Sequence, residues 1–262
     1  MAFTNGPVPL YTFASFDDPS IAHGISTRAG GLSEGPYASL NLGSSVGDQT
    51  ARVDENRARF AEVLGFPQRR LVTTPQVHGN SVLVVDESNA DGALAVRADI
   101  LITTRPGYLL MQRFADCVPL LFWHTRAQAV AVAHAGWRGT ALGVAGRTVA
   151  TIQAQTGAGP VGLRAAIGPS IGPCCFEVGD EVVAQFPDAA GAVHEGRRGR
   201  PHLDLWELNR RDLVRAGVAA AHIEVARVCT RCEHETFFSH RALGYPAGRF
   251  GGGIGIRPSH AA

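Results

Sequence analysis

The stretch ADCVPLLFWHTRAQAVAVAHAGWRG, residues 115–139, contains two apolar segments that are separated by a short polar one. Residues 118–123 and 128–134 have the length of β-strands and are rich in aliphatic side chains. Two such segments joined by a short loop are typical of a β-hairpin. The sequence therefore predicts an antiparallel pair of strands in the middle of the chain.

The length of the hairpin loop determines which side chains share a face. If the loop consists of the four residues 124–127, Trp123 pairs with Gln128 and Cys117 lies directly opposite His134. Directly opposed residues have Cβ atoms about 4.5 to 5.5 Å apart, so this thiol and this imidazole can share a metal ion. A five-residue loop would place them on opposite faces, unless a bulge intervenes.

Further apolar segments of strand length lie on both sides of the hairpin, and helical patterns are fewer. Strands in runs with interspersed helices favour an α+β fold over a regular βαβ alternation. Residues 48–65 are predicted as a helix with Asp48 or Thr50 as its N-cap and Gly65 at its end. The glycine-rich residues 24–43 are predicted as a long ordered loop, and the tail from Gly251 as irregular. The other predicted strands are residues 71–73, 82–85, 100–103, 109–113, 163–167 and 223–228, the other helices are residues 139–154 and 205–216, and residues 195–200 are predicted as a solvated loop.

The composition indicates one large domain over residues 1–262. The chain has 262 residues, of which 45% are hydrophobic, and single cores extend to about 250 to 300 residues. No apolar run of about 18 residues and no signal-peptide pattern occurs, so we expect a cytoplasmic protein that does not contact membranes. The net charge of +1 argues against nucleic-acid binding. All 24 basic side chains are Arg, so any bound anion would meet guanidinium groups.

The five cysteines are an odd number in a chain without a secretory signature, which argues against a disulfide framework. Cys229 and Cys232 have the C-x-x-C spacing of metal or redox sites, but no second pair of ligands stands near them in the sequence. Cys174 and Cys175 lie in a segment rich in glycine and proline. We interpret both pairs as parts of packed loops rather than as ligands.

His78, Cys117 and His134 each stand at the end of a predicted strand. Two imidazoles and a thiolate suit zinc and leave a fourth tetrahedral position for water or substrate. Taken singly, such residues are more often a small buried cysteine and hydrogen-bonded histidines, and that interpretation stays open. In a third interpretation Cys117 is a nucleophile and His134 is its base, an arrangement that does not need His78.

Two arginines near glycines are candidate anion-binding groups. Arg138 stands between Gly136 and Gly139, where a predicted strand passes into a helix, and exposed N–H groups at a helix start attract anions. Arg28 precedes Gly30 in a segment whose glycines permit a ligand to approach the backbone. The alternatives are a plain tight turn at Arg138 and a surface side chain at Arg28.

Several motifs occur together in this chain: QVHG at 76–79, ADCVP at 115–119, HAGWRG at 134–139, GPSIGPC at 168–174 and FFSHR at 237–241. Their combination resembles the laccase-domain family, also called the polyphenol oxidase or purine nucleoside phosphorylase family. The resemblance extends over about residues 21–256. The chain departs from the usual family pattern at His240, where Tyr is commoner, and in an arginine-rich insert before residues 202–205.

The resemblance implies an α+β fold, a layered sandwich of mixed and antiparallel sheets with flanking helices, similar to that of a group of cysteine hydrolases and a bacterial deamidating toxin. It also implies zinc, with copper less favoured, on His78, Cys117 and His134. The implied activities are phosphorolysis of adenosine, inosine, guanosine and methylthioadenosine, and hydrolytic deamination of adenosine, so the expected partners are a purine nucleoside and phosphate. The alternative is an amide hydrolase with a cysteine nucleophile, with a role in peptidoglycan precursor editing.

The resemblance assigns roles to further residues. Zinc can lower the pKa of bound water from near 15.7 to about 7, which suits deamination, and Asp116 is the nearest candidate acid or base, with a structural hydrogen bond as its alternative. Arg28 and Arg138 are the predicted phosphate clamps, and Asn41 is predicted to orient the substrate. Laccase activity is not expected, because multicopper oxidation needs many converging histidines and the ten histidines here are scattered.

Overall fold

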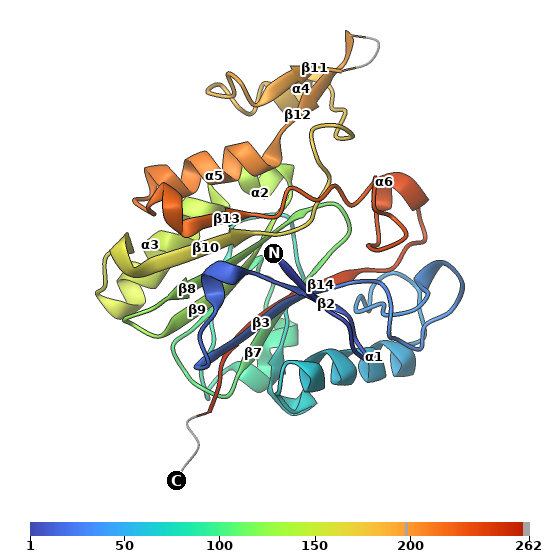
Figure 1. The fold of residues 1–262 in the computed structure, drawn as a ribbon, viewed down its shortest axis with the longest axis vertical. Coiled ribbons are helices and arrows are strands. Elements are labelled where there is room, and N and C mark those ends of the chain that lie inside the picture. The colour runs from blue at the N-terminus through green and yellow to red at the C-terminus, as the bar shows by residue number, and fades with distance from the viewer. Residues whose placement is uncertain (197–198, 259–262) are drawn as a thin grey trace.

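Two stacked β-sheets form the centre of the molecule (Figure 1). The computed structural model describes residues 1–196 and 199–258, and over these residues the strands form two six-stranded sheets and one two-stranded ribbon. The first sheet has the order β1 (Ala2–Thr4), β2 (Leu10–Thr12), β3 (Ile21–Ser26), β14 (Phe250–Ile256), β7 (Leu109–Phe114) and β4 (Leu71–Val72). The second has the order β13 (Ile223–Val225), β10 (Leu163–Ile167), β8 (Val118–His124), β9 (Ala129–Ala135), β6 (Ile100–Thr103) and β5 (Val82–Val84), and the ribbon consists of β11 (Val193–Glu195) and β12 (Pro201–Leu203).

Helices cover the outer faces of both sheets (Figure 1). The first sheet is covered by α1 (Thr50–Val63), whose Phe60 belongs to a buried cluster that the helix shares with this sheet. The second sheet is covered by α3 (Val144–Thr156) and α5 (Leu205–Arg215). The shorter helices are α2 (Trp137–Ala141), α4 (Asp180–Val183) and α6 (His240–Leu243).

Side-chain alternation along β8 shows how the layers are packed. Successive side chains of a strand point to opposite faces. Leu120 and Phe122 belong to the core beneath α3 and α5, whereas Leu121 and Trp123 belong to the core between the two sheets. The layer order is therefore helix, sheet, sheet, helix. Both sheets contain antiparallel and parallel pairs, so the predicted sandwich of mixed sheets is confirmed.

The predicted hairpin forms with a four-residue loop, but its register differs by two residues. The loop consists of residues 125–128, one position later than predicted, because Gln128 adopts a positive φ of 48° and the chain reverses there. Pro119 consequently pairs with His134. The prediction that Cys117 lies directly opposite His134 is wrong, since Cys117 lies on the diagonal. A shift of two keeps both side chains on the same face, which is the face between the sheets.

Residues 250–256 form a buried strand, so the prediction of an irregular tail from Gly251 is wrong over residues 251–256. Residues 259–262 of this prediction lie outside the described residues. β14 lies between β3 and β7 at the centre of the first sheet. Cβ atoms on Gly252 and Gly253 would lie 3.0 and 2.9 Å from the rings of Phe114 and Phe60. The aromatic rings thus occupy the space that side chains of the strand would need. A strand made of glycine has no alternation of side chains from which it could be predicted.

Two further predictions differ from the structure near α1. Residues 24–26, placed in the long loop, belong to β3. The N-cap of α1 is Gln49, whose side chain makes no capping hydrogen bond, so the predicted cap at Asp48 or Thr50 is wrong. The carboxylate of Asp48 instead accepts hydrogen bonds from Ser33 and Asn41.

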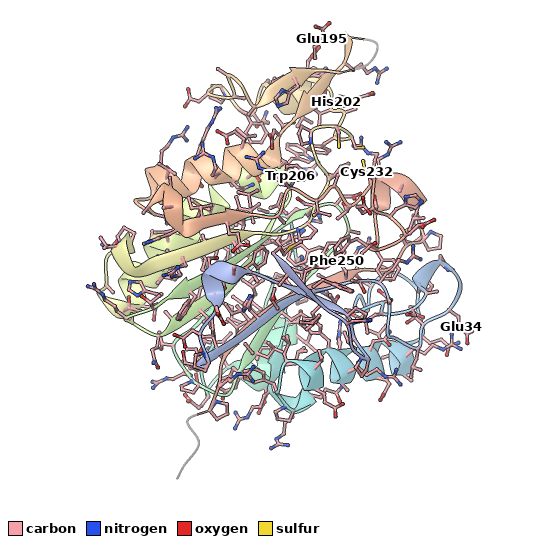
Figure 2. The ribbon with its side chains drawn as sticks, viewed as in Figure 1. Glu34, Glu195, His202, Trp206, Cys232 and Phe250 are labelled. Carbon is pink, nitrogen blue, oxygen red and sulfur yellow. The ribbon has the colours of Figure 1, made fainter. Side chains whose placement is uncertain are left out.

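Of the predicted solvated loop at residues 195–200, Glu195 is the last residue of β11, and Gly196, Gly199 and Arg200 lie between β11 and β12. Glu195 lies at the outer edge of the molecule (Figure 2). Residues 197 and 198 of this prediction lie outside the described residues. Among the residues that are described, no helix is both long enough and apolar enough to cross a membrane.

Candidate active site

Three potential metal ligands meet at one end of the layer between the sheets. His78 follows β4, Cys117 directly precedes β8, and His134 lies near the end of β9. Their ligand atoms all lie within 4.8 Å of one another, and the two imidazole rings are 4.8 Å apart at their centroids. We call His78, Cys117 and His134 the mixed cluster. The structure thus brings together the three ligands that the sequence predicts.

The close approach of these side chains depends on Gly136. A Cβ atom on Gly136 would lie 3.0 Å from Sγ of Cys117 and 3.4 Å from Cδ2 of His78. The distance to Sγ is tighter than that of most real Cβ contacts, whereas the distance to Cδ2 is close to ordinary van der Waals contact. A side chain at this position would therefore press on the thiol and leave no free space beside the imidazole. The glycine of the HAGWRG motif is needed for the cluster, in addition to its place at the start of α2.

Asp99 orients the two histidines of the mixed cluster through hydrogen bonds. Its carboxylate is fully buried, and Oδ1 lies 2.8 Å from Nδ1 of His134. The same carboxylate accepts hydrogen bonds from the backbone N–H groups of Val77, His78 and Gly79, at 3.2, 3.0 and 2.8 Å. One buried carboxylate therefore orients one ligand by its ring and the other by its backbone, which holds His78 at a positive φ of 60°.

The charged groups of the mixed cluster and Asp99 shift one another's pKa values. Burial by itself would raise the pKa of Asp99, but the hydrogen bonds from His134 and Gly79 hold it below its usual range. Burial likewise opposes ionisation of Cys117, yet the neighbouring His134 and His78 lower the pKa of the thiol to about 6. Burial opposes the charged form of His134, but Cys117 and Asp99 raise its pKa to about 9. The arrangement favours a thiolate at neutral pH.

The mixed cluster opens into a cavity of about 600 Å³. A volume of roughly 300 to 1,000 Å³ is typical of small-molecule sites. Basic groups dominate the charged part of the wall, and the described residues that line it include no Asp or Glu. Besides the cluster, the lining residues are Gly43, Ser44, Ser45, Pro75, Gln76, Val77, Leu94, Arg97, Arg113, Ala115, His240 and Arg249.

Three arginines, Arg97, Arg113 and Arg249, make the cavity positive. None of them forms a salt bridge with a carboxylate in the described part of the chain. Arg113 donates instead to Oε1 of Gln76 and to the carbonyl of Thr74, at 3.0 and 2.6 Å. Burial, together with repulsion from other arginines, lowers its pKa to about 10. Unpaired guanidinium groups in a partly buried wall suit an anionic ligand.

Asp116 and Asn41 lie beside the cavity rather than on its lined wall. Asp116 has a positive φ of 88°, and its two carboxylate oxygens accept hydrogen bonds from the Thr230 hydroxyl and the Arg241 backbone N–H, at 2.7 and 2.6 Å. Asn41 is fully buried, and its Oδ1 accepts from the backbone N–H of Arg249 at 2.9 Å. Their predicted roles as acid or base and as substrate-orienting group stay predictions.

Arg28 and Arg138 are not among the residues that line the cavity. Arg28 donates to the carbonyls of Ala38 and His234, at 3.0 and 2.9 Å, and lies over the ring of Phe238. Arg138 is exposed and stacks on Trp137 at 4.2 Å from the ring centroid. The structure therefore does not bring the two predicted phosphate clamps to the mixed cluster, and that assignment stays a prediction.

Sequence reasoning missed Asp99 and the arginines of the cavity wall. A signal for Asp99 exists, because a carboxylate directly before the apolar strand at Ile100–Thr103 needs a buried partner. The absence of Lys indicates that arginine holds any anion. Which arginines do so depends on contacts between distant segments, and no local pattern distinguishes Arg113 or Arg249 from other arginines.

The donor set of the mixed cluster fits a single metal ion with two nitrogen ligands and one sulfur ligand. Among residues 1–196 and 199–258, the groups of three or more His, Cys, Asp or Glu side chains that can hold a metal are this cluster and a group of four cysteines. Neither contains the many converging histidines that multicopper oxidation requires.

Comparisons with known proteins match nearly the whole chain, although the matching family and relatives are named after different activities. The family model described as "Multi-copper polyphenol oxidoreductase laccase" matches residues 22–257. The purine nucleoside phosphorylase YlmD of Geobacillus stearothermophilus is 44% identical over 245 residues, which are 89% of this chain and 89% of that protein. The adenosine deaminase RL5 of an unknown prokaryotic organism is 40% identical over 229 residues, 83% of this chain and 87% of that protein.

Solved structures agree with these matches. The crystal structure of YlmD from Geobacillus stearothermophilus has a TM-score of 0.90 and 41% identity, covering 98% of this chain and 99% of that chain. The crystal structure of the Bacillus licheniformis hypothetical protein YfiH has the same TM-score at 36% identity. The likeness covers nearly the whole chain, so the α+β architecture is that of these proteins.

Proposed function

The chain belongs to the family described as multi-copper polyphenol oxidoreductase laccase, and we propose that it is a zinc-dependent purine nucleoside phosphorylase that also deaminates adenosine. The observation that carries the proposal is the meeting of a three-donor metal set with three arginines in one cavity. Relatives named purine nucleoside phosphorylase and adenosine deaminase supply the substrate class. The proposed substrates are adenosine, inosine, guanosine and methylthioadenosine.

We assign the metal to the mixed cluster. Two imidazoles and a thiolate are a zinc set with one coordination position left for water or substrate. When bound, zinc supplies a Lewis acid and acidifies a water molecule. Asp99 engages Nδ1 of His134, so Nε2 is the ring nitrogen that is left to face the metal. The carboxylate also strengthens this imidazole as a ligand, as hydrogen-bonded acids do in other zinc sites.

We assign the phosphate to the arginines of the cavity wall, Arg97, Arg113 and Arg249, in place of Arg28 and Arg138, which do not line the cavity. A guanidinium group binds phosphate oxygens through two parallel N–H bonds. Phosphorolysis needs the anion held beside the sugar carbon that it attacks, and fixed cations on the wall provide this positioning. Asn41 contributes by holding the backbone of Arg249. Cys117 and His134 line the cavity, and Asp99 fixes the ring of His134, so the nucleoside would contact side chains whose positions are fixed.

A second candidate function has a specific observation in its favour. Asp99, His134 and Cys117 follow one another as acid, base and thiol, which is the order of groups in cysteine hydrolases. In that case the thiol attacks an amide carbonyl and no metal is needed. Iodoacetamide distinguishes the two functions. A nucleophilic Cys117 is alkylated at the same rate with and without chelator, whereas a metal-bound thiolate is alkylated faster after chelation.

Replacing His78 by Ala tests the proposed function. We expect phosphate-dependent release of hypoxanthine from inosine to fall at least 100-fold, because one of three metal ligands is lost (roughly 2.7 kcal/mol of transition-state stabilisation or more). Elemental analysis of the same preparation should show loss of zinc from this cluster. His194→Ala is the matched control, since His194 is half exposed on β11. Unchanged turnover in metal-free wild-type protein would contradict the proposal.

A further inference from the structure

Four cysteine thiols meet at the surface, away from the mixed cluster. Cys174 and Cys175 lie in the segment after β10, and Cys229 and Cys232 lie in the segment after β13. The four sulfur atoms all lie within 4.8 Å of one another. We call these residues the four-cysteine cluster. Each pair taken alone looks like part of a packed loop, and only the fold brings the two pairs together.

The spacing of the sulfurs matches a tetrahedral metal site. The Sγ atom of Cys232 lies 3.8 Å from that of Cys174 and 3.5 Å from that of Cys175. Zinc binds thiolates at about 2.3 Å, so the edge of a tetrahedron of sulfurs around it measures about 3.8 Å. A disulfide bond requires about 2.05 Å, and all four cysteines are free.

The backbone holds the two cysteine pairs in place without the help of a metal. β10 and β13 are parallel neighbours, so the segments that follow them leave the sheet on the same side. A bridge between Ser170 and Cys229 continues this pairing, and the backbone N–H of Thr230 donates to the carbonyl of Ser170 at 3.0 Å. The sulfurs are therefore positioned by main-chain hydrogen bonds, which pre-organise them as ligands.

Donor groups surround the sulfurs as they do in thiolate sites. The backbone N–H of Gly172 donates to Sγ of Cys229 at 3.3 Å, and Nη1 of Arg231 donates to Sγ of Cys175 at 3.4 Å. N–H groups aimed at sulfur stabilise negative charge on it and orient metal ligands. A cation and an amide at these positions suit four thiolates around a divalent ion better than they suit four neutral thiols.

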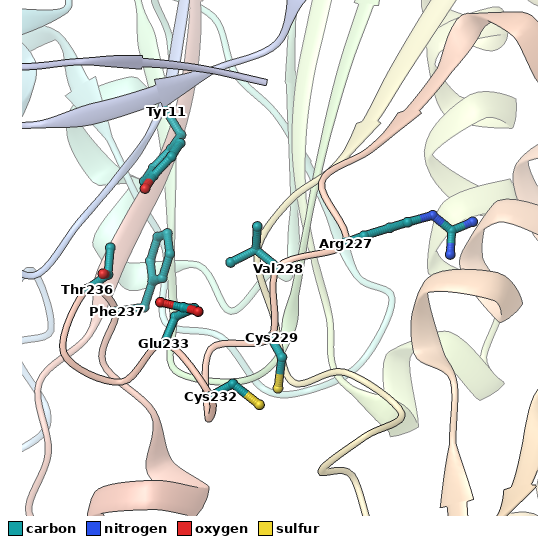
Figure 3. A pocket seen from close by; sticks show the side chains of 8 residues that line it. All are labelled: Tyr11, Arg227, Val228, Cys229, Cys232, Glu233, Thr236 and Phe237. Atoms are coloured by element: carbon teal, nitrogen blue, oxygen red, sulfur yellow. The ribbon is translucent and has the colours of Figure 1, made fainter.

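We propose that Cys174, Cys175, Cys229 and Cys232 bind a structural zinc ion. Four soft thiolates in a tetrahedral arrangement select zinc among common divalent metals and leave no position for substrate. Cys229 and Cys232 border a cavity of about 370 Å³, and Figure 3 shows their sulfurs on the side of it away from Tyr11. Binding requires that each cysteine gives up its proton to solvent, and no oxidation takes place.

The zinc links the surface segments to the active site. Thr230, between the two ligands of the C-x-x-C pair, donates to Oδ1 of Asp116, and the backbone N–H of Ile171 donates to the Asp116 carbonyl at 2.9 Å. Asp116 directly precedes Cys117 of the mixed cluster. Fixing both segments with one ion thus fixes the backbone that carries a ligand of the active site.

Metal counting in two reciprocal double variants tests the proposal. We expect the wild-type chain, purified with reductant and without chelator, to contain two zinc ions per chain by elemental analysis. C229S/C232S should contain one, and its Tm should fall. H78A/H134A should also contain one and lose activity. Because each variant removes a different ion, failure of the mixed cluster to bind zinc leaves the result for the four cysteines readable.

If C229S/C232S does not fold, replacing zinc by cobalt in the wild-type chain still tests the proposal. The charge-transfer absorption from thiolate to cobalt grows with the number of thiolate ligands, so a site with four thiolates is distinguishable from a site with one. Persistence of the four-thiolate spectrum in H78A/H134A supports the proposal. A wild-type chain whose only metal disappears in H78A/H134A overturns it, as does a disulfide among the four cysteines in the freshly purified protein.

Discussion

The mixed cluster and the four-cysteine cluster use similar donor atoms in opposite ways. The mixed cluster lies between the sheets, has three ligands, and opens into a cavity walled by arginines. The four-cysteine cluster lies on two surface segments and has four ligands, of which Cys174 and Cys232 are exposed. Three ligands leave a coordination position for chemistry, whereas four close the site. In the proposed assignment, the number of ligands, rather than their depth, separates the reactive site from the structural one.

The two clusters also differ in what holds their ligands. A buried carboxylate, Asp99, orients the histidines of the mixed cluster. Main-chain hydrogen bonds between parallel segments position the four cysteines. Asp116 connects the two systems, because it precedes Cys117 and is bonded to Thr230. Substitutions of these supporting residues therefore test whether each cluster keeps its geometry independently of the other.

Asp99→Asn is expected to have the largest effect. The amide keeps the size of the carboxylate but cannot accept from His134 and from three backbone N–H groups at once. Loss of such a partner typically weakens metal binding about 10- to 100-fold. Competition titration should show this loss at the mixed cluster, together with a fall of about 100-fold in phosphorolysis, while the zinc of the four cysteines stays bound.

Asp86→Asn is the matched control for this change, because the Asp86 carboxylate accepts hydrogen bonds from the backbone N–H and the hydroxyl of nearby Ser88 in a surface turn. Equal zinc affinity in Asp99→Asn and wild-type protein would mean that Asp99 supports the fold and not the ligands. The contrast between a carboxylate-supported and a backbone-supported site would then be wrong.

The two clusters also differ in how well the sequence predicts them. The mixed cluster is predictable because its ligands stand at strand ends in separate motifs, and a hairpin with an even register shift keeps Cys117 and His134 on one face. The four-cysteine cluster is not, because its two pairs meet only through the parallel pairing of β10 with β13. Parallel neighbours can be far apart in the chain, so no local spacing reveals them.

The fold shows the same division between local and long-range information. The two apolar strands of the hairpin are predicted within one residue at each end, whereas the strand predicted at residues 223–228 ends three residues earlier, at Val225. β14 escapes prediction, because its glycines make room for Phe60 and Phe114 from other elements. The arginines of the cavity wall escape for a related reason. Arg113 is recognisable as a site residue only once Gln76 and Thr74 are seen beside it.

Thr230→Val is expected to have an intermediate effect. Valine keeps the shape of threonine but leaves Oδ1 of the buried Asp116 without its 2.7 Å partner. An unsatisfied buried acceptor costs about 1 to 3 kcal/mol. We expect kcat to fall about tenfold (~1.4 kcal/mol) with both zinc ions retained and the pH profile of kcat unmoved, since Asp116 then only positions Cys117.

A shift of one limb of that pH profile would contradict the positioning role and favour the predicted role of Asp116 as acid or base. Thr151→Val is the matched control, because the Thr151 hydroxyl donates to the Arg147 carbonyl on an exposed helical face. Loss of zinc from the four-cysteine cluster in Thr230→Val would show instead that the two clusters share their support.

Trp206→Phe is expected to have the smallest effect, on stability alone. Trp206 lies at the start of α5 (Figure 2), its Nε1 donates to Ser170 Oγ at 2.6 Å, and its ring covers Gly172 beside Cys174. Losing this bond and part of the ring should lower the free energy of unfolding by about 1 to 2 kcal/mol. Urea denaturation measures the loss, with Trp137→Phe as control, because Trp137 is only partly buried and stacks on Arg138.

The decisive comparison is between Trp206→Phe alone and Trp206→Phe combined with C229S/C232S. If zinc and the indole hold the same segment, removing both costs a different free energy from the sum of the two separate losses, because neighbouring groups that share a support are not additive. Additive losses would mean that the metal stabilises only its own ligands. The four-cysteine cluster would then stabilise its own segments without affecting Asp116, and the inferred connection between the surface and the active site would be wrong.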